Sequence, residues 1–245
     1  MELTSKYYSI IVGLLEKIVK EEKDSLRRAS QLLANSIESN KIIHVIGAGH
    51  SAMLGEELFY RAGGLAVVNP IIDNDITVGH GALKSTLLEN VEGYAEVLLE
   101  SARVVEGDTV IIVSTSGVNT FPIEAALKAK DMGASTIAIT SKKYSSQLEP
   151  RNPWGKHLYE VVDVAIDNKV PRGDAVLELP GLNMKVAPVS TILNSFIASL
   201  LVAYTVNILL SKGIKPPIWL SSHLPEAREH NKELFEKYSH RIKLL

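Results

Sequence analysis

The chain has 245 residues, 46% hydrophobic and 22% charged, which supplies a sizeable core and argues against a disordered chain. Its formal net charge of -2 gives no support for a nucleic-acid or acidic-membrane partner. The absence of cysteine excludes disulfides, thiolate nucleophiles and thiolate metal ligands, and the N-terminus shows no secretory pattern, so we expect a cytoplasmic protein.

The first 40 residues combine charged and apolar residues at helical spacing, which predicts helices over residues 4–38 with a break near Asp24 and Ser25. Further along, short apolar runs alternate with helical patterns. The apolar runs predict strands at residues 41–46, 65–69, 109–114, 135–140 and 161–166. The segments between them predict helices at residues 51–62, 90–104 and 119–132, followed by a final helix at residues 223–239.

Alternation of apolar strands with helices is typical of a parallel sheet that is covered on both faces. We therefore expect a three-layer αβα sandwich with a five-stranded parallel sheet, as in flavodoxin-like folds. The whole chain, residues 1–245, is predicted to form a single domain with a core at residues 40–210. Two segments are expected to be irregular: residues 144–157, and residues 168–181 with a short extra strand at 175–179.

Residues 192–210 are uncharged and long enough to span a membrane. They also contain several polar residues, among them Asn194, Ser195 and Asn207. This content favours a helix that is buried in a core or in a subunit interface, and we expect no membrane association.

Two Gly- and Ser-containing loops each follow a predicted buried strand and open onto a predicted helix. The first strand and loop read KIIHVIGAGHS from Lys41, and the second read TVIIVSTSGVNT from Thr109. Such a loop presents backbone N–H groups and small hydroxyls at a helix N-terminus, where an anion is favoured. Two of them in one domain predict a site for a phosphorylated small molecule.

A dinucleotide site is the first alternative, because the first loop fits G-x-G-x-x-A from Gly47 to Ala52. That site needs an acidic residue about 20 positions further on, at the end of the second strand. The nearest acid is Asp73, which lies beyond Pro70. The second loop also has no role in that scheme, so the nucleotide interpretation is the weaker one.

The second loop could instead be a simple helix cap, which needs one hydroxyl. It carries four hydroxyls within seven positions, at Ser114, Thr115, Ser116 and Thr120. Hydroxyls and amides together can bind a phosphate dianion without a buried lysine. Phosphate binding is therefore the favoured interpretation.

Together the loops resemble the sugar isomerase (SIS) domain family over about residues 40–210. The matching residues are Gly49-His50-Ser51 and Ser114-Thr115-Ser116-Gly117. In that family the second loop usually reads S-x-S-G-x-[ST], whereas this chain has Asn119 in place of the last hydroxyl, with Thr120 next. The resemblance implies a phosphate site made of Gly49, Ser51, Ser114, Thr115, Ser116, Gly117, Asn119 and Thr120, with Ser190 and Thr191 at the start of the apolar helix closing over the sugar.

Three longer stretches resemble a phosphosugar-binding branch of the SIS family, and this branch implies no particular reaction. They read GAGHSAMLGEELFYRAGGL, STLLENVEGYA and GIKPPIWLSSHLPEAREHN. Val91-Glu92-Gly93 also resembles a segment of the N-acetylmuramic acid 6-phosphate etherases, in which the Glu is catalytic. A Glu-Glu-Leu-x-x-Arg stretch that ends at Arg61 resembles one in phosphoheptose isomerases, where the second Glu is catalytic.

Proton transfer next to a carbonyl needs a carboxylate or a histidine as base. Glu92 is the first candidate and lies three residues after Glu89, so a helix would place both on one face. Its alternative role is that of a solvated first-turn residue that favours the helix dipole. Glu57, next to Glu56, is the second candidate, and its alternative is a surface salt bridge with Arg61.

His50 lies inside the first loop and is expected to take part in the chemistry. In several family members a late histidine enters the neighbouring subunit's site, which makes His230 a candidate and His223 its competitor, although both are also plausible surface residues. His80, in a Gly-flanked loop, is either a ring-opening group or exposed. No histidine has the spacing of a metal motif, so we expect no metal and no cofactor.

The leading functional hypothesis is an aldose–ketose isomerase that acts on a sugar or amino-sugar phosphate. An etherase or another lyase on an N-acetylamino-sugar phosphate, and a non-catalytic phosphosugar sensor, are the alternatives. Residues 192–210 and the N-terminal helix together carry more apolar surface than one face of the sheet can cover. This excess predicts a homodimer or homotetramer.

Overall fold

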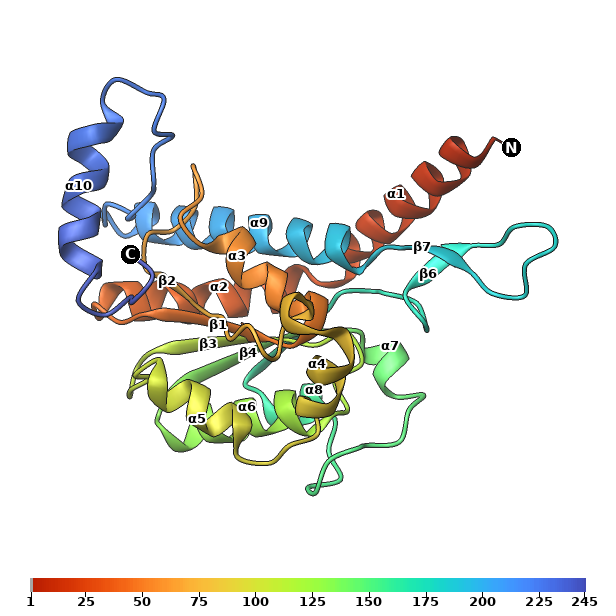
Figure 1. Ribbon diagram of the computed structural model, residues 1–245. Coiled ribbons are helices and arrows are strands. Elements are labelled where there is room, and N and C mark those ends of the chain that lie inside the picture. The colour runs from red at the N-terminus through yellow and green to blue at the C-terminus, as the bar shows by residue number, and fades with distance from the viewer. Residues whose placement is uncertain (1) are drawn as a thin grey trace.

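A parallel five-stranded sheet forms the middle layer of a three-layer sandwich (Figure 1). The computed structural model describes residues 2–245. The sheet order is β2-β1-β3-β4-β5, which confirms the predicted fold class and all five strands. The strands are β1 (Ile43–Gly47), β2 (Val68–Ile71), β3 (Thr109–Val113), β4 (Ser135–Thr140) and β5 (Val164–Asp167). β2 begins later than predicted because Leu65 pairs with Ile218 instead of with the sheet.

Strand side chains alternate between two buried clusters, one on each face of the sheet. On one face, residues such as Val45, Ile111 and Ile139 pack under α2 (Lys23–Glu38), α3 (Met53–Leu58) and α9 (Ser190–Ser211) (Figure 1). On the other face, residues such as Ile46 and Ile112 pack under α5 (Tyr94–Ser101), α6 (Thr120–Asp131) and α8 (Leu158–Val161). The outer layers therefore hold the strand ends rigidly.

The predicted helices are present, and their limits differ where single residues decide the backbone. α1 (Leu3–Glu21) and α2 are separated at Glu22, two residues before the predicted break. The helix expected from residue 90 begins at Tyr94, because Gly93 adopts a left-handed conformation with φ of 82°. α10 (Ala227–Tyr238) is the expected final helix.

Several short elements were not predicted from the sequence. They are the 3-10 turns η1 (Gly49–Ala52) and η2 (Val78–His80), the helices α4 (Ala82–Leu88), α7 (Lys142–Ser145) and α8, and the strand β7 (Val186–Pro188). β7 pairs with β6 (Ala175–Leu177), which fulfils the prediction of an extra strand. This hairpin projects from the body beside α1 (Figure 1), and the Tyr7 hydroxyl donates a 2.9 Å hydrogen bond to the Pro188 carbonyl.

The uncharged segment forms α9, which lies along α2 in Figure 1. One side of α9, including Leu193, Ile197 and Leu201, is fully buried in the core cluster, where α9 packs on α2 and α3. The other side is open, with Leu210 59% exposed. By length and composition alone α9 could cross a membrane, but a helix in the core of a soluble protein meets the same two criteria. The predicted burial is thus met on one face of the helix only.

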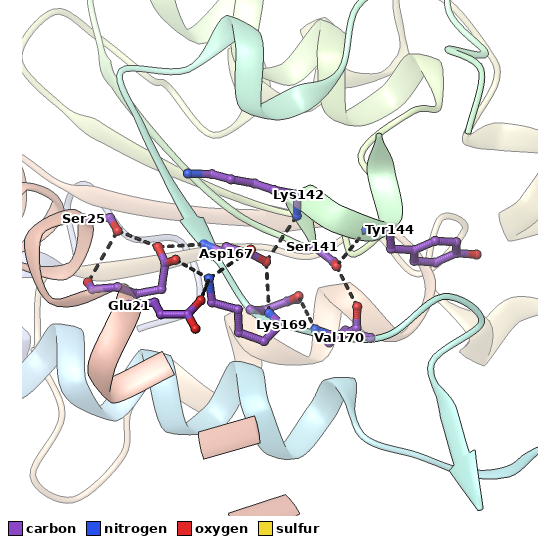
Figure 2. Close-up of polar contacts among 10 residues, drawn as sticks. Glu21, Ser25, Ser141, Lys142, Tyr144, Asp167, Lys169 and Val170 are labelled. Atoms are coloured by element: carbon purple, nitrogen blue, oxygen red, sulfur yellow. Dashed lines mark hydrogen bonds and ion pairs between the residues drawn. The ribbon is translucent and has the colours of Figure 1, made fainter. Parts of the chain in front are cut away.

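A buried ion cluster joins the junction of α1 and α2 to the end of β5 (Figure 2). The Lys169 ammonium lies 2.6 Å from a Glu22 carboxylate oxygen, 3.0 Å from Glu21 and 3.1 Å from Asp167. Burial lowers the pKa of Lys169, but the hydrogen bonds to Glu22, Glu21 and Asp167 outweigh it and leave that pKa raised. Glu22 is 5% exposed and also accepts a 2.6 Å hydrogen bond from Ser25.

We expect Lys169→Met to lower the free energy of unfolding by about 3 kcal/mol, because it leaves two buried carboxylates without a cation. Lys185→Met is the control: its ammonium pairs with Glu178 at an exposed site, and its loss should change stability by less than about 1 kcal/mol. Urea denaturation followed by circular dichroism measures both values. Equal effects of the two substitutions would show that the cluster does not stabilise the fold.

Candidate functional site

The two Gly- and Ser-containing loops leave adjacent strands at the same edge of the sheet. Gly47 at the end of β1 lies opposite Val113 at the end of β3. Residues 48–52 and 114–119 therefore emerge side by side and share one cleft of about 260 Å³. Its walls are formed by Ala48, Ser51, Glu89, Val113, Ser114, Thr115, Ser116, Phe121, Pro122, Tyr144, Gly173 and Asp174.

The second loop offers the cleft a set of unused hydrogen-bond donors. Within residues 2–245, the amides of Thr115 and Ser116 donate to no protein acceptor, and neither do the hydroxyls of Ser51, Thr115 and Ser116. The Ser114 hydroxyl accepts a 3.1 Å hydrogen bond from the Gly117 amide and keeps its own hydrogen free. These donors lie just before the N-terminus of α6, where the helix dipole favours an anion.

Two glycines give these loops their shape. Gly117 has φ of 60°, and a Cβ there would lie 2.8 Å from the Thr140 hydroxyl. A Cβ on Gly47 would lie 2.8 Å from the backbone of Ser51, so glycine allows the first loop to turn back on its strand. In this structure both glycines act through backbone packing; Gly117 is buried and does not line the cleft.

Three further residues of the predicted phosphate set have other partners. The Gly49 amide donates to the Ile76 carbonyl at 2.8 Å. Thr120 is 3% exposed, and its hydroxyl lies 3.4 Å from the Arg151 carbonyl. The Asn119 side-chain amide donates to a Glu89 carboxylate oxygen at 2.5 Å. The donors without a protein acceptor are thus concentrated at Ser51 and at the three positions from Ser114.

Ser190 and Thr191 line a second, smaller hollow of about 90 Å³. Ser51 lines both hollows, which makes them neighbours. The Ser190 hydroxyl donates to Asp174 at 2.7 Å, and the same carboxylate accepts from the Ser190 and Val189 amides. Asp174 therefore caps α9, and the Ser190 hydroxyl is engaged with it.

Glu89 is one of two carboxylates that line the main cleft, and the other, Asp174, is engaged in capping α9. Glu89 follows α4, and its carbonyl accepts a 2.9 Å hydrogen bond from the Phe121 amide. Burial raises the pKa of Glu89, and the hydrogen bond from Asn119 opposes that shift in part. A carboxylate with a raised pKa beside a cluster of free donors has the character of a catalytic base.

The two carboxylates that the sequence favoured lie elsewhere. Glu92 is exposed in the turn between α4 and α5 and does not line the cleft. Glu89 and Glu92 do not share a helix face, because α4 ends at Leu88 and α5 begins at Tyr94. Glu57 lines the smaller hollow and accepts a 2.5 Å hydrogen bond from Arg61, which is the salt bridge considered as its alternative role.

Of the candidate histidines, only His50 lines one of the two neighbouring hollows. His50 is exposed on η1 and lines the smaller hollow with Glu57. His230 lies on α10, with its ring nitrogen 2.7 Å from the Ile218 carbonyl, and lines neither hollow within this chain. His80 lies 3.1 Å from Asp75, and His223 lines a separate surface hollow beside α10. Across residues 2–245, no group of three or more metal-ligating side chains lies close enough to hold an ion.

Glu89 was paired with Glu92 in the sequence, but no sequence signal placed it in the cleft. Its contact with Asn119 joins residues 30 positions apart, and no local motif encodes it. Asp174 had no sequence signal either: it caps a helix that begins 16 residues later. Both residues come from connections between elements rather than from the loops that carry the recognisable motif.

A family model described as SIS domain matches residues 6–141 of the chain. UPF0309 protein GK1441 of Geobacillus kaustophilus is 40% identical over 243 residues, covering 99% of this chain and 97% of that protein.

Solved structures with a similar fold include a phosphoheptose isomerase, GmhA from Neisseria gonorrhoeae. It has a TM-score of 0.54 and 17% identity, with 85% of this chain and 97% of that chain covered. The Vibrio vulnificus NanR protein complexed with ManNAc-6P has a TM-score of 0.53 and 16% identity, with 100% of this chain and 70% of that chain covered. These likenesses concern the fold.

We expect the effect of Glu89→Gln on stability to depend on pH. The folded-state pKa of Glu89 is raised, so the folded protein binds more protons than the unfolded chain above the ordinary glutamate pKa, and stability falls as pH rises through this window. Glutamine does not titrate. The stability of the variant relative to the parent should therefore increase from about pH 4 to about pH 7 in urea denaturation.

Glu92→Gln is the control for that experiment, since it removes a carboxylate from an exposed position. If the relative stability of Glu89→Gln stayed constant over the pH range, the carboxylate of Glu89 would not be held in a desolvated site.

Proposed function

Because the chain belongs to the SIS domain family, we propose that its cleft binds the phosphate of a sugar phosphate and that Glu89 transfers a proton next to the carbonyl of that sugar. The observation that carries this proposal is that Glu89 lines the same cleft as the unused donors of Ser51 and the second loop. A phosphate bound there would hold the rest of the sugar within the cleft or the adjoining hollow.

The phosphate would be bound by neutral groups. Ser51 contributes a hydroxyl from the first loop, and Ser114, Thr115 and Ser116 contribute hydroxyls and two amides from the second. Hydrogen bonds to an ionised acceptor are about twice as strong as neutral ones, so several of them can replace an ion pair. The N-terminus of α6 adds its dipole to the same position.

Asn119 would act as a positioning residue for the proposed base. Its amide donates to one oxygen of Glu89 and leaves the other oxygen without a side-chain partner among the described residues. The same residue is the N-cap of α6, directly after the phosphate-binding loop. The base and the phosphate site would therefore be fixed relative to each other by one short segment of chain.

Aldose–ketose isomerisation needs a base that moves a proton between neighbouring carbons. In the proposed reaction the Glu89 carboxylate takes the proton from one carbon and returns it to the other. His50 and Glu57 in the adjoining hollow are the proposed groups for ring opening. The fold that the chain shares with a phosphoheptose isomerase supports the same reaction class. Elimination from an N-acetylamino-sugar phosphate is the second candidate, because it uses the same base at C2.

We expect Glu89→Gln to bind sugar phosphates but to lose proton transfer by roughly 10²- to 10⁴-fold. Binding is measured by calorimetry against a panel of hexose, heptose and amino-sugar phosphates. Proton transfer is measured by NMR as deuterium incorporation from heavy water at the carbon next to the carbonyl. The product distinguishes an isomer from an elimination product.

Glu92→Gln is the matched control and should leave deuterium incorporation unchanged. Loss of incorporation in Glu92→Gln alone would return Glu92 to the role of base. Binding without incorporation in the parent protein would favour a non-catalytic phosphosugar sensor, and a protein of similar fold, NanR, has been solved complexed with ManNAc-6P. If the parent binds no phosphorylated sugar, the proposal is wrong.

We also propose that residues 1–245 form one SIS domain of a cytoplasmic homodimer or homotetramer. The open side of α9, with Ser199, Val202 and Val206, lines an apolar groove of about 350 Å³. α9 carries no charged residue along its length, and the two charged side chains that line the groove, Glu57 and Arg61, pair with each other. A symmetric contact would therefore bring two uncharged helix faces together. A second copy of this chain is therefore the proposed occupant.

We expect light scattering after size exclusion to give at least twice the mass of one chain at micromolar concentration. Val202→Glu should shift the protein towards the monomer, because it places a charge in the proposed contact. Val97→Glu, at an exposed position on the opposite layer, is the control. A parent protein that is monomeric at this concentration would refute the proposed assembly.

A further inference from the structure

The charged side chains that line the main cleft are both acidic. They are Glu89 and Asp174, and no Lys or Arg belongs to the lining among residues 2–245. The proposed phosphate donors are neutral, so the cleft has a donor-rich end for an anion and two carboxylates in its walls. A ligand that carried only negative charge would be attracted by the donors and repelled by the walls.

Asp174 is held rigidly in this position. The backbone of Asp174 is left-handed, with φ of 66°. One carboxylate oxygen accepts hydrogen bonds from the amides of Val189 at 3.0 Å and Ser190 at 2.8 Å. The other oxygen accepts from the Ser190 hydroxyl at 2.7 Å. A carboxylate oxygen has about two acceptor positions, so this second oxygen keeps one for a ligand.

Capping of α9 uses both oxygens of the Asp174 carboxylate and three of its acceptor positions. Here the cap is a carboxylate that lines the same cavity as Ser114, Thr115 and Ser116. The wall of the cleft therefore carries a negative charge at Asp174. An ammonium group matches both this charge and the remaining acceptor position, because it supplies a positive charge and three donors.

We propose that the ligand of this cleft is a sugar phosphate with a free, unacetylated amine, and that Asp174 selects the amine. This inference rests on the proposed function, since it takes the phosphate to be bound by Ser51 and the second loop. The amine pairs with the open acceptor position of Asp174, while Glu89 remains the base. An acetylated amine loses both the charge and two of its donors, and a hydroxyl in its place lacks the charge.

The experiment compares glucosamine 6-phosphate, N-acetylglucosamine 6-phosphate, glucose 6-phosphate and inorganic phosphate by calorimetry. We expect the free amine to bind at least about tenfold more tightly than the acetylated and hydroxyl forms, as one charge-assisted hydrogen bond would give. Asp174→Asn should reduce that preference to about twofold or less by weakening the binding of glucosamine 6-phosphate, and it should not weaken the binding of glucose 6-phosphate, which the carboxylate repels.

Asp131→Asn is the matched control, because Asp131 is exposed at the far end of α6, and it should retain the full preference. Thermal unfolding of each variant separates a loss of helix capping from a loss of selectivity. Asp174→Ser, which keeps a side-chain oxygen at the start of α9, replaces Asp174→Asn if the latter does not fold.

Equal affinity for the three sugar phosphates, or tightest binding of the acetylated form, would overturn the inference and leave the proposed function in place. Equal weakening of all three in Asp174→Asn would also overturn it and reduce Asp174 to a helix cap. Absence of binding by every sugar phosphate would overturn both the inference and the proposed function.

Discussion

Gly47 and Val113 lie opposite each other in the parallel pairing of β1 with β3, and the site depends on this register. Because both strands end at the same edge of the sheet, the loops that follow them lie next to each other. Every residue of β1 and β3 is buried, and the side chains of the two strands pack into the helical layers on both faces of the sheet. β1 and β3 pair through backbone hydrogen bonds, so the side chains of the loops are not needed for this pairing and can contact a ligand.

A second constraint comes from α6, whose first residues connect three parts of the cleft. The loop before it carries the free donors, its N-cap Asn119 holds the Glu89 carboxylate, and the Phe121 amide holds the Glu89 carbonyl. Glu89 follows a helix of only seven residues, which offers little rigidity of its own. Its position is therefore set by α6, so an anion that orders the second loop would also fix the carboxylate.

The sequence predicted the features that depend on local pattern. Apolar runs gave all five strands and their order of layers, and the Gly and Ser residues after β1 and β3 gave the loops that share the cleft. It did not predict which acid lies there, because that is decided by the contact of Asn119 with Glu89 across 30 positions. Glu92 had the better motif, but the left-handed Gly93 starts a new helix and leaves Glu92 in an exposed turn.

The electrostatics of the cleft follow from the absence of a cation in its lining among the residues described. A base near neutral pH needs a pKa well above that of a free glutamate, and burial moves Glu89 in that direction. A lysine beside the phosphate would bind the anion more strongly but would lower the pKa of Glu89 again. Neutral hydroxyls and amides avoid that conflict, because they bind phosphate without adding a full charge. The hydrogen bond that Asn119 donates to one oxygen of Glu89 opposes this rise in pKa.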